Sequence, residues 1–525
     1  MLMFGAPMPA LAESNPQVLS AYLRARAADS DGKVGMAADG YALALMAAPD
    51  DAVIAIRAYR VAVSAGDFTL LNRARSVLER ADMAPGDAAI LALAEAGLAG
   101  DATATQSAIE RVKTGALSFL VPSFRAWAAF DNPKAAMAAL DAAGTNAIAR
   151  RYAQESRALM LIAAGKTAEA NDLLAVLLRA DGNQVDLRIT AAQLFAKAGQ
   201  PDAARLLLVG NDPSVVAVRN NLGAGRAAST ALGISYLLTR LASDLNDGEA
   251  SRLLIVIARA ALRIDPGNDR VRLLLASALA RDNAPDHALT VLTAIAPGNA
   301  FYQVAEAERV ELLHKSGDAS AALAAAAALA EAPSATISDF RRYADLLIEA
   351  GRAEAAVGAY QRAIDRDRAA ADWVLYLQLG SALDRAGKWP LAKTMLEKAV
   401  ALAPDEAVAL NYLGYGLLEH GGDLSVAGKL LERASMLRPQ DLSILDSLAW
   451  AYFLQGETMR ALPLLETAAK GEPANSAINE HLGDVYWKAG RRYEARYAWQ
   501  AAALLAKDAD ADRIVAKIAN GLVAR

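Results

Sequence analysis

The sequence contains no cysteine and few aromatic residues. Among its 525 residues there are 0 Cys and 4 His, and aromatic side chains make up 6%. The absence of cysteine excludes disulfide frameworks, zinc–thiolate sites, iron–sulfur clusters and a cysteine nucleophile, and we expect no lipid anchor on this chain. No apolar run approaches the roughly 18–20 residues of a membrane-spanning helix, so we also expect no transmembrane span.

Neither sign of charge is in large excess. The chain carries 54 Lys and Arg against 59 Asp and Glu, a net charge of −5. A nucleic-acid binder needs a basic surface to displace phosphate counterions, so we expect no nucleic-acid partner. Hydrophobic types reach 54%, above the usual roughly 45–50%. Because aromatics are scarce, this excess consists of small aliphatic residues, chiefly alanine.

Columns of small or apolar residues recur about every 34 residues in the last third of the chain. Leucine, glycine or alanine, and two further alanines recur in phase, and a proline closes most units. The columns are Leu379, Leu413, Leu448 and Leu482; Gly380, Gly414, Ala449 and Gly483; Ala392, Ala427, Ala461 and Ala495; Ala399, Ala434, Ala468 and Ala502; and Pro404, Pro439 and Pro473. Small residues at such positions indicate close helix crossings, which we expect at Gly380 and Ala392.

These columns resemble the tetratricopeptide repeat (TPR), a helix–turn–helix unit of about 34 residues. Turn glycines at the same spacing, such as Gly32, Gly66 and Gly100, extend the resemblance over nearly the whole chain. It implies an all-α, right-handed α-solenoid of about 14 units. We expect these units to begin near residues 18, 52, 86, 120, 151, 185, 235, 269, 303, 337, 373, 407, 442 and 476.

The spacing of the turn glycines also predicts the domain organisation. From Gly199 to Gly317 there are 16 residues more than three units need, and 209–234 is rich in Asn, Gly and Asp-Pro breakers. We therefore expect an irregular insert and hinge at 209–234, between an N-terminal array at 15–208 and a C-terminal array at 235–507. Residues 508–525 are expected to form a capping helix. Residues 1–14 are interpreted as either the end of a signal peptide or a flexible terminus.

The sequence completes no catalytic or metal-binding motif. The four histidines, His287, His314, His420 and His481, are scattered over different units without metal-ligand spacing, and we interpret them as solvated helix residues. Gly165-Lys166-Thr167 lacks the first glycine of a phosphate-binding loop. We therefore expect no enzyme, no metal and no cofactor.

The resemblance implies a protein-binding groove. In TPR proteins the first helix of each unit lines a concave groove, chiefly through its second, fifth, ninth and twelfth residues. In the last three units we expect the groove to bind a partner through Asn411, Tyr415, Asp446, Trp450, Phe453, Glu480, Asp484 and Trp487. Burial in the core is the competing interpretation for Trp450 and Trp487. The acidic residues argue against a clamp for acidic peptide termini here, whereas Arg26 and Arg60 take ninth positions near the other end.

The C-terminal third also resembles bacterial envelope TPR proteins, some of which are adaptors of carboxyl-terminal processing proteases. The first residues, MLMFGAPMPALA, end in a small-x-small pattern that is typical of signal-peptide cleavage. The first hypothesis is therefore a periplasmic or cell-envelope scaffold or adaptor that holds a protein partner. The second is a cytoplasmic co-chaperone or assembly factor. The sequence does not identify the partner.

Overall fold

The structure, a computed structural model, describes residues 16–180, 184–246 and 251–522. Within these ranges it contains thirty α-helices, one short 3-10 helix and no strand. The predicted all-α class is therefore confirmed. The segment 1–14 that was interpreted as a signal-peptide end or flexible terminus lies outside the described residues.

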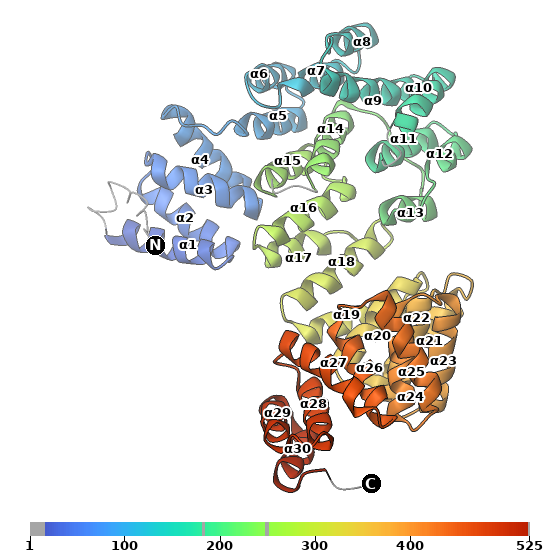
Figure 1. The fold of residues 1–525 in the computed structure, drawn as a ribbon. Helices are drawn as coiled ribbons and strands as arrows, with labels where there is room; N and C mark the ends of the chain where they lie inside the picture. Colours follow the sequence, from blue (N-terminus) through green and yellow to red (C-terminus); the bar gives the residue numbers. More distant parts are fainter. Residues whose placement is uncertain (1–15, 181–183, 247–250, 523–525) are drawn as a thin grey trace. The chain divides into compact units, whose positions relative to one another are not determined.

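The helices form two compact units, unit 1 at 1–325 and unit 2 at 326–525, and the boundary falls inside α19. Figure 1 labels the helices in chain order. The helices up to the boundary are α1 Pro16–Ser30, α2 Val34–Ala47, α3 Ala52–Ala65, α4 Phe68–Arg80, α5 Ala88–Ala99, α6 Ala102–Lys113, α7 Val121–Ala128, α8 Pro133–Asp141, α9 Ala147–Ala163, α10 Thr167–Ala180, α11 Val185–Lys197, α12 Pro201–Leu207, α13 Pro213–Asn220, α14 Thr230–Leu245, α15 Ser251–Ile264, α16 Asp269–Arg281, α17 Pro285–Thr293, α18 Tyr302–Lys315 and α19 Ala319–Glu331. Unit 2 continues with α20 Ile337–Glu349, α21 Ala353–Arg366, α22 Trp373–Arg385, α23 Trp389–Leu402, α24 Ala407–Glu419, α25 Leu424–Leu437, α26 Leu442–Leu454, α27 Thr458–Gly471, α28 Ser476–Lys488, α29 Arg492–Leu505 and α30 Asp508–Asn520.

The helices pair as the repeat predicts. The first helices of the pairs are α1, α3, α5, α7, α9, α11, α14, α16, α18, α20, α22, α24, α26 and α28, and each begins within five residues of a predicted unit start. Only α13 and α30 stand outside a pair among the described helices. The expected solenoid of about 14 helix–turn–helix units is therefore confirmed.

Local side-chain chemistry sets the ends of these helices. At the start of α3, the carboxylate of Asp51 accepts hydrogen bonds from the backbone N–H groups of Val53 and Ile54. The same helix ends at Gly66, whose φ of 75° lies in the left-handed region that favours glycine. The 34-residue glycine column is thus the turn between paired helices.

The small-residue columns lie at the helix crossings. A Cβ placed on Gly380 of α22 would come within 2.8 Å of the Leu396 side chain of α23, and one placed on Gly414 of α24 would come equally close to Leu431 of α25. Ala392 is fully buried at the same level as Gly380. The predicted close approach at Gly380 and Ala392 is confirmed.

The segment 209–234 lies inside unit 1, so the two units divide at a different place from the predicted arrays at 15–208 and 235–507. It contains α13, whose first turn is capped by Asp212, and an ordered stretch that leads into α14. The Arg226 side chain bonds both carboxylate oxygens of Asp265 at 2.7 Å, and its backbone N–H donates to the Gln193 carbonyl. That this segment acts as a hinge stays a prediction.

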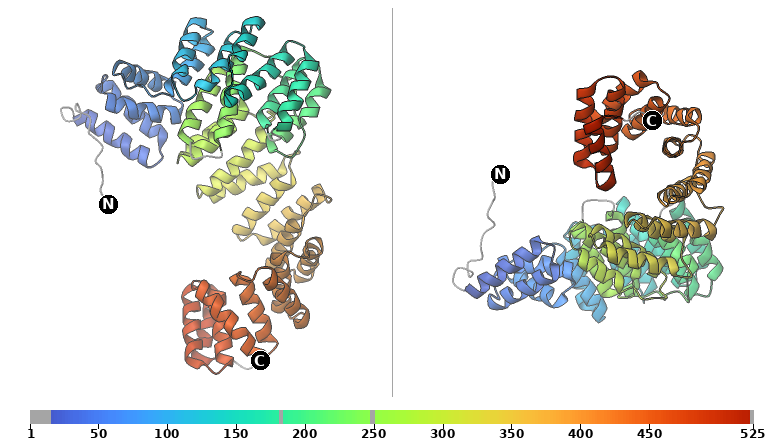
Figure 2. Two further views of the ribbon diagram at one scale, coloured as in Figure 1. Left: turned by 45° about the horizontal axis from the view of Figure 1, so that its top comes forward. Right: turned by 90° about the horizontal axis from the view of Figure 1, so that it is seen from below.

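Within unit 1 the chain folds back on its own first-helix surface. Helix α15 packs against α3 and α5, and α14 packs against α5, α7 and α11. Figures 1 and 2 show the blue-to-teal helices curving around α14 and α15. Glycine permits the closest approach, since a Cβ on Gly233 of α14 would overlap the Trp127 ring of α7. Most of the N-terminal groove is therefore filled by the chain itself.

Candidate functional site

The predicted groove residues of unit 2 lie on three successive first helices. Asn411 and Tyr415 are on α24, Asp446, Trp450 and Phe453 on α26, and Glu480, Asp484 and Trp487 on α28. Helix α24 packs against α26, and α26 against α28. The structure thus brings these side chains onto neighbouring helices of one stack, although their surroundings differ.

An aromatic stack dominates the middle of this surface. The partly exposed Trp450 ring lies parallel to His481, with centroids 4.1 Å apart, and stacks on Phe453 at 5.1 Å. His481 Nδ1 lies 2.8 Å from a carboxylate oxygen of Asp446. Trp450 therefore stacks on both Phe453 and the His481 ring, which is itself hydrogen-bonded to Asp446.

His481 is buried, and its interpretation as a solvated helix residue is wrong. Burial by itself lowers the pKa of the imidazole, but the carboxylates of Asp446, Asp484 and Glu480 outweigh this effect, so the pKa of His481 is raised. The sequence contained the signal for this contact, because Asp446 and His481 are one repeat apart and occupy adjacent first helices. The fifth residue of one first helix, Asp446, thus pairs with the sixth residue of the next first helix, His481.

The last repeat presents its acidic residues to the chain's own C-terminal helix. Lys517 of α30 lies 2.5 Å from Glu480 and 2.7 Å from Asp484, and Arg513 forms a second ion pair with Glu480. The Trp499 indole N–H donates to Asp484 at 2.8 Å. Glu480 and Asp484 are therefore satisfied within the chain.

Trp487 is packed against the same helix. A Cβ placed on Gly521 would lie 1.8 Å from its ring, and the Trp499 ring lies 5.4 Å away. The guanidinium of Arg492 covers the ring at 3.8 Å. Of the eight predicted groove residues, Trp487, Glu480 and Asp484 thus form the seam between α28 and α30.

Asn411 and Tyr415 complete the central surface. Both are partly exposed, and the amide oxygen of Asn411 has no hydrogen-bond partner within the described chain. Burial, reinforced by the charge of Glu419 and a hydrogen bond to it, raises the pKa of the Tyr415 phenol, so Tyr415 stays neutral and donates its proton to Glu419. Together with Trp450 and Phe453, these side chains offer aromatic surface beside unfilled polar capacity.

In unit 1 a polar core joins the folded-back helices to the array. The Tyr236 hydroxyl of α14 donates to Glu155 of α9 at 2.7 Å, and Tyr152 donates to Asp244 at 2.7 Å. Burial raises the pKa of Glu155 against the opposing charge of Arg240. These contacts close the first-helix surface of the middle repeats.

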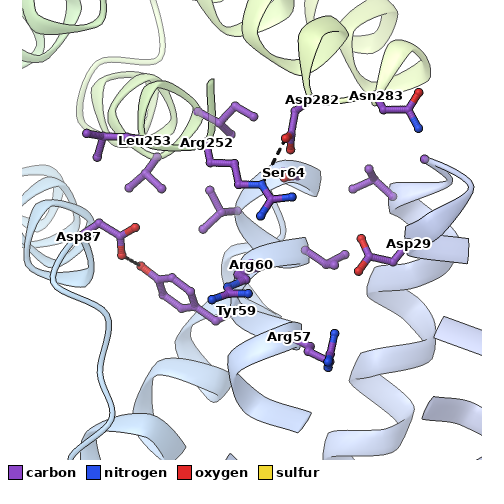
Figure 3. A pocket seen from close by; sticks show the side chains of 16 residues that line it. Asp29, Arg57, Tyr59, Arg60, Ser64, Asp87, Arg252, Leu253, Asp282 and Asn283 are labelled. Atoms are coloured by element: carbon purple, nitrogen blue, oxygen red, sulfur yellow. Dashed lines mark hydrogen bonds and ion pairs between the residues drawn. The ribbon is translucent and has the colours of Figure 1, made fainter. Parts of the chain in front are cut away.

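A cavity of about 570 Å³ remains between the first two helix pairs and α15. Figure 3 shows Tyr59 and Arg60 reaching into it from α3, opposite Arg252 and Leu253 from α15. Tyr59 donates to Asp87 at 2.9 Å, and Arg252 pairs with Asp282 at 3.3 Å. Arg60 follows from its ninth position in the repeat, whereas Arg252 does not, because no repeat register shows that α15 folds back here.

The described residues hold neither a metal-ion cluster nor a helix that could cross a membrane. They contain no group of three or more His, Asp or Glu side chains arranged to hold a metal ion. Within the same ranges no helix is both long and apolar enough to cross a membrane.

Comparison with known proteins agrees with the helix pairing. No protein-family model matches the chain. A TPR repeat-containing protein of Pseudomonas aeruginosa is 36% identical to it over 89 residues. The chain is built of tetratricopeptide repeats. The match spans 17% of this TPR chain and 15% of that relative, so the two are similar over only a small part of either length.

Several solved TPR structures are similar to parts of the chain. A thermophilic TPR protein of Thermus thermophilus is 23% identical with a TM-score of 0.31, over 35% of this chain and 100% of that one. YrrB, described as a TPR protein with an unusual peptide-binding site, is 21% identical with a TM-score of 0.27, over 34% of this chain and 91% of that one. MamA is 21% identical with a TM-score of 0.27, over 36% and 97%. At these TM-scores none of the three bears on function.

Proposed function

We propose that this TPR chain is a non-enzymatic scaffold or adaptor that binds an extended or helical segment of a protein partner. The binding surface is the first-helix surface of α24 and α26. The observation that supports this proposal is the partly exposed pair of rings formed by Trp450 and Phe453, stacked over the buried His481. Aromatic anchors of this kind dominate the binding energy of protein interfaces.

A polar group beside the rings supplies the second part of the recognition. The unsatisfied amide oxygen of Asn411 accepts one hydrogen bond. A backbone N–H of a bound segment supplies the donor. A hydrogen bond to this acceptor favours binding, because folding has already removed water from it and binding adds no further desolvation cost.

Site-specific photo-crosslinking in cells tests this surface. A photoreactive residue at position 411 should give a discrete adduct with a protein partner, and Trp450→Ala with Phe453→Ala should abolish that adduct. The matched control is position 429 on the exposed side of α25, where we expect no adduct. Equal crosslinking from both positions, or an adduct that survives the double substitution, would show that α24 and α26 do not form the binding surface.

We place this adaptor in the bacterial cell envelope, with a cytoplasmic co-chaperone or assembly factor as the alternative. The support is the small-x-small end of MLMFGAPMPALA together with the resemblance of the C-terminal third to envelope TPR proteins. Fractionation of the host cell separates the two. Recovery from the periplasmic fraction with an N-terminus near Glu13 is the expected result, and recovery from the cytosol alone favours the alternative.

A further inference from the structure

Two arginines that line the cavity of unit 1 form no ion pair within the part of the chain that the structure describes. Arg57 and Arg60 both line it, and neither forms an ion pair with a carboxylate of the described residues. The Arg57 guanidinium lies over the Tyr22 ring, 6.0 Å from its centroid, and its charge also acts on the Asp29 carboxylate. Two guanidinium groups are therefore available to a ligand in this cavity.

A third cation lies behind the cavity wall. Arg259 of α15 is partly buried and donates to the carbonyls of Val63 at 3.1 Å and Ser64 at 2.6 Å, two residues that line the cavity. Burial lowers the pKa of Arg259 to about 10, and no carboxylate opposes this effect. At neutral pH it remains charged, and its field in this low-dielectric region favours a negative charge close by.

The acidic residues of the cavity do not cancel these cations. Asp87 accepts from the Tyr59 hydroxyl, and Asp282 is paired with Arg252. Asp29 forms no ion pair in Figure 3; burial raises its pKa, although the nearby charge of Arg57 opposes this effect. The lining holds three arginines and three aspartates, so the excess positive charge of this region comes from Arg259 behind the wall.

We propose that this cavity binds an anionic ligand, whose carboxylate or phosphate groups are held by Arg57 and Arg60. Its size of about 570 Å³ is within the range of small-ligand sites, roughly 300–1,000 Å³. Planar guanidinium groups bind such anions through paired, charge-assisted hydrogen bonds. The site is separate from the proposed surface on α24 and α26, and it does not depend on that proposal.

Calorimetric titration of the full chain tests the site with two probes, citrate and a Glu-rich peptide blocked at both termini. We expect at least one probe to bind, with affinity that falls as salt is added. Binding of citrate alone identifies a small anion as the ligand, and binding of the peptide alone identifies acidic side chains of a protein. The blocked ends exclude recognition of a terminal carboxylate.

Substitutions that remove a charge from the cavity lining test whether the cavity prefers an anion. Arg57→Gln and Arg60→Gln should each weaken binding about tenfold, because each removes charge-assisted hydrogen bonds. Asp29→Asn should strengthen it. The control Arg73→Gln removes an exposed arginine of α4 outside the cavity and should change nothing. Absence of binding by both probes, or affinity that is the same in the Arg57 and Asp29 variants as in the parent chain, overturns the proposal.

Discussion

At the scale of single residues, the stack of Phe453, Trp450 and His481 combines packing with charge. A protonated imidazole over an indole gains cation–π attraction, and its second contact, to Asp446, neutralises the buried carboxylate. The geometry of the proposed binding surface therefore depends on the protonation of one histidine.

The raised pKa of His481 predicts a pH dependence of stability. A histidine whose folded pKa exceeds its unfolded value of about 6.5 stabilises the fold below that value, and the contribution is lost as pH rises through the folded pKa. Asp446→Asn removes the main opposing charge, so the pKa of His481 should fall. The loss of unfolding free energy should be largest near pH 6 and smaller in alkali. Urea unfolding across pH and NMR titration of the imidazole measure both effects.

Asp384→Asn is the matched control for this prediction. Asp384 lies 2.7 Å from His420, and both side chains are more than a third exposed, so solvent screens their interaction. The variant should leave the titration of His481 unchanged. A His481 pKa that is the same in Asp446→Asn and in the parent chain would contradict the prediction.

The sequence predicts on which helix face each candidate residue lies, but it does not predict which side chains surround that residue. The repeat register placed all eight on first helices, since Tyr415, Trp450 and Asp484 follow from helix starts that the sequence fixes to within a few residues. What covers each one depends on elements outside the register. Lys517 reaches Glu480 and Asp484 from α30, and a capping helix has no repeat partner from which its contacts can be derived.

At the scale of the helix, close crossings limit which side chains a repeat accepts. A Cβ on Gly483 of α28 would lie 2.3 Å from the Trp499 ring of α29. Gly358 of α21 is also helical, yet a Cβ there would meet nothing within 4 Å. The same substitution at these two positions should therefore have opposite effects on stability.

Gly483→Ala should lower the unfolding free energy by about 1–3 kcal/mol, because the added methyl forces the buried indole to move. Gly358→Ala should raise it by about 0.5–1 kcal/mol, because alanine has the higher helix propensity and no clash opposes it. Thermal and urea unfolding of the two variants check the pair. If both stabilise, the crossing at Trp499 has room that the structure does not show.

Helix α30 is attached to α28 through ion pairs with the buried carboxylates of Glu480 and Asp484. Lys517→Met should leave Glu480 with Arg513 alone and Asp484 without a cation, while keeping the length of the side chain. Removal of one partner of a buried pair costs about 3–5 kcal/mol, and we expect roughly the lower value since Lys517 is 17% exposed. The matched substitution Lys429→Met, at an exposed position of α25, should change the unfolding free energy by less than about 0.5 kcal/mol. Equal effects would contradict the buried attachment.

At the scale of the molecule, the repeat predicts where helices begin, but it does not predict which helices pack onto distant repeats instead of only onto their neighbours. Helix α14 begins within five residues of a predicted unit start, yet α14 and α15 pack onto the first helices of earlier repeats. The packing of α14 and α15 on the earlier repeats depends on long-range hydrogen bonds, such as those from Tyr236 to Glu155 and from Arg259 to Val63. Residues 81 and 196 positions apart in the sequence give no periodic signal.

The division into two compact units predicts two unfolding transitions for the full chain. Arg259→Met should shift only the transition of unit 1, because it removes two hydrogen bonds to the α3 carbonyls, although methionine spares the desolvation of a charge. Lys517→Met should shift only the transition of unit 2. Differential scanning calorimetry of the two variants and of the double variant measures this independence, since effects at uncoupled sites add. A single transition that both substitutions displace would mean that the 525 residues unfold as one cooperative body, as a stack with strong interfaces between all neighbouring repeats does.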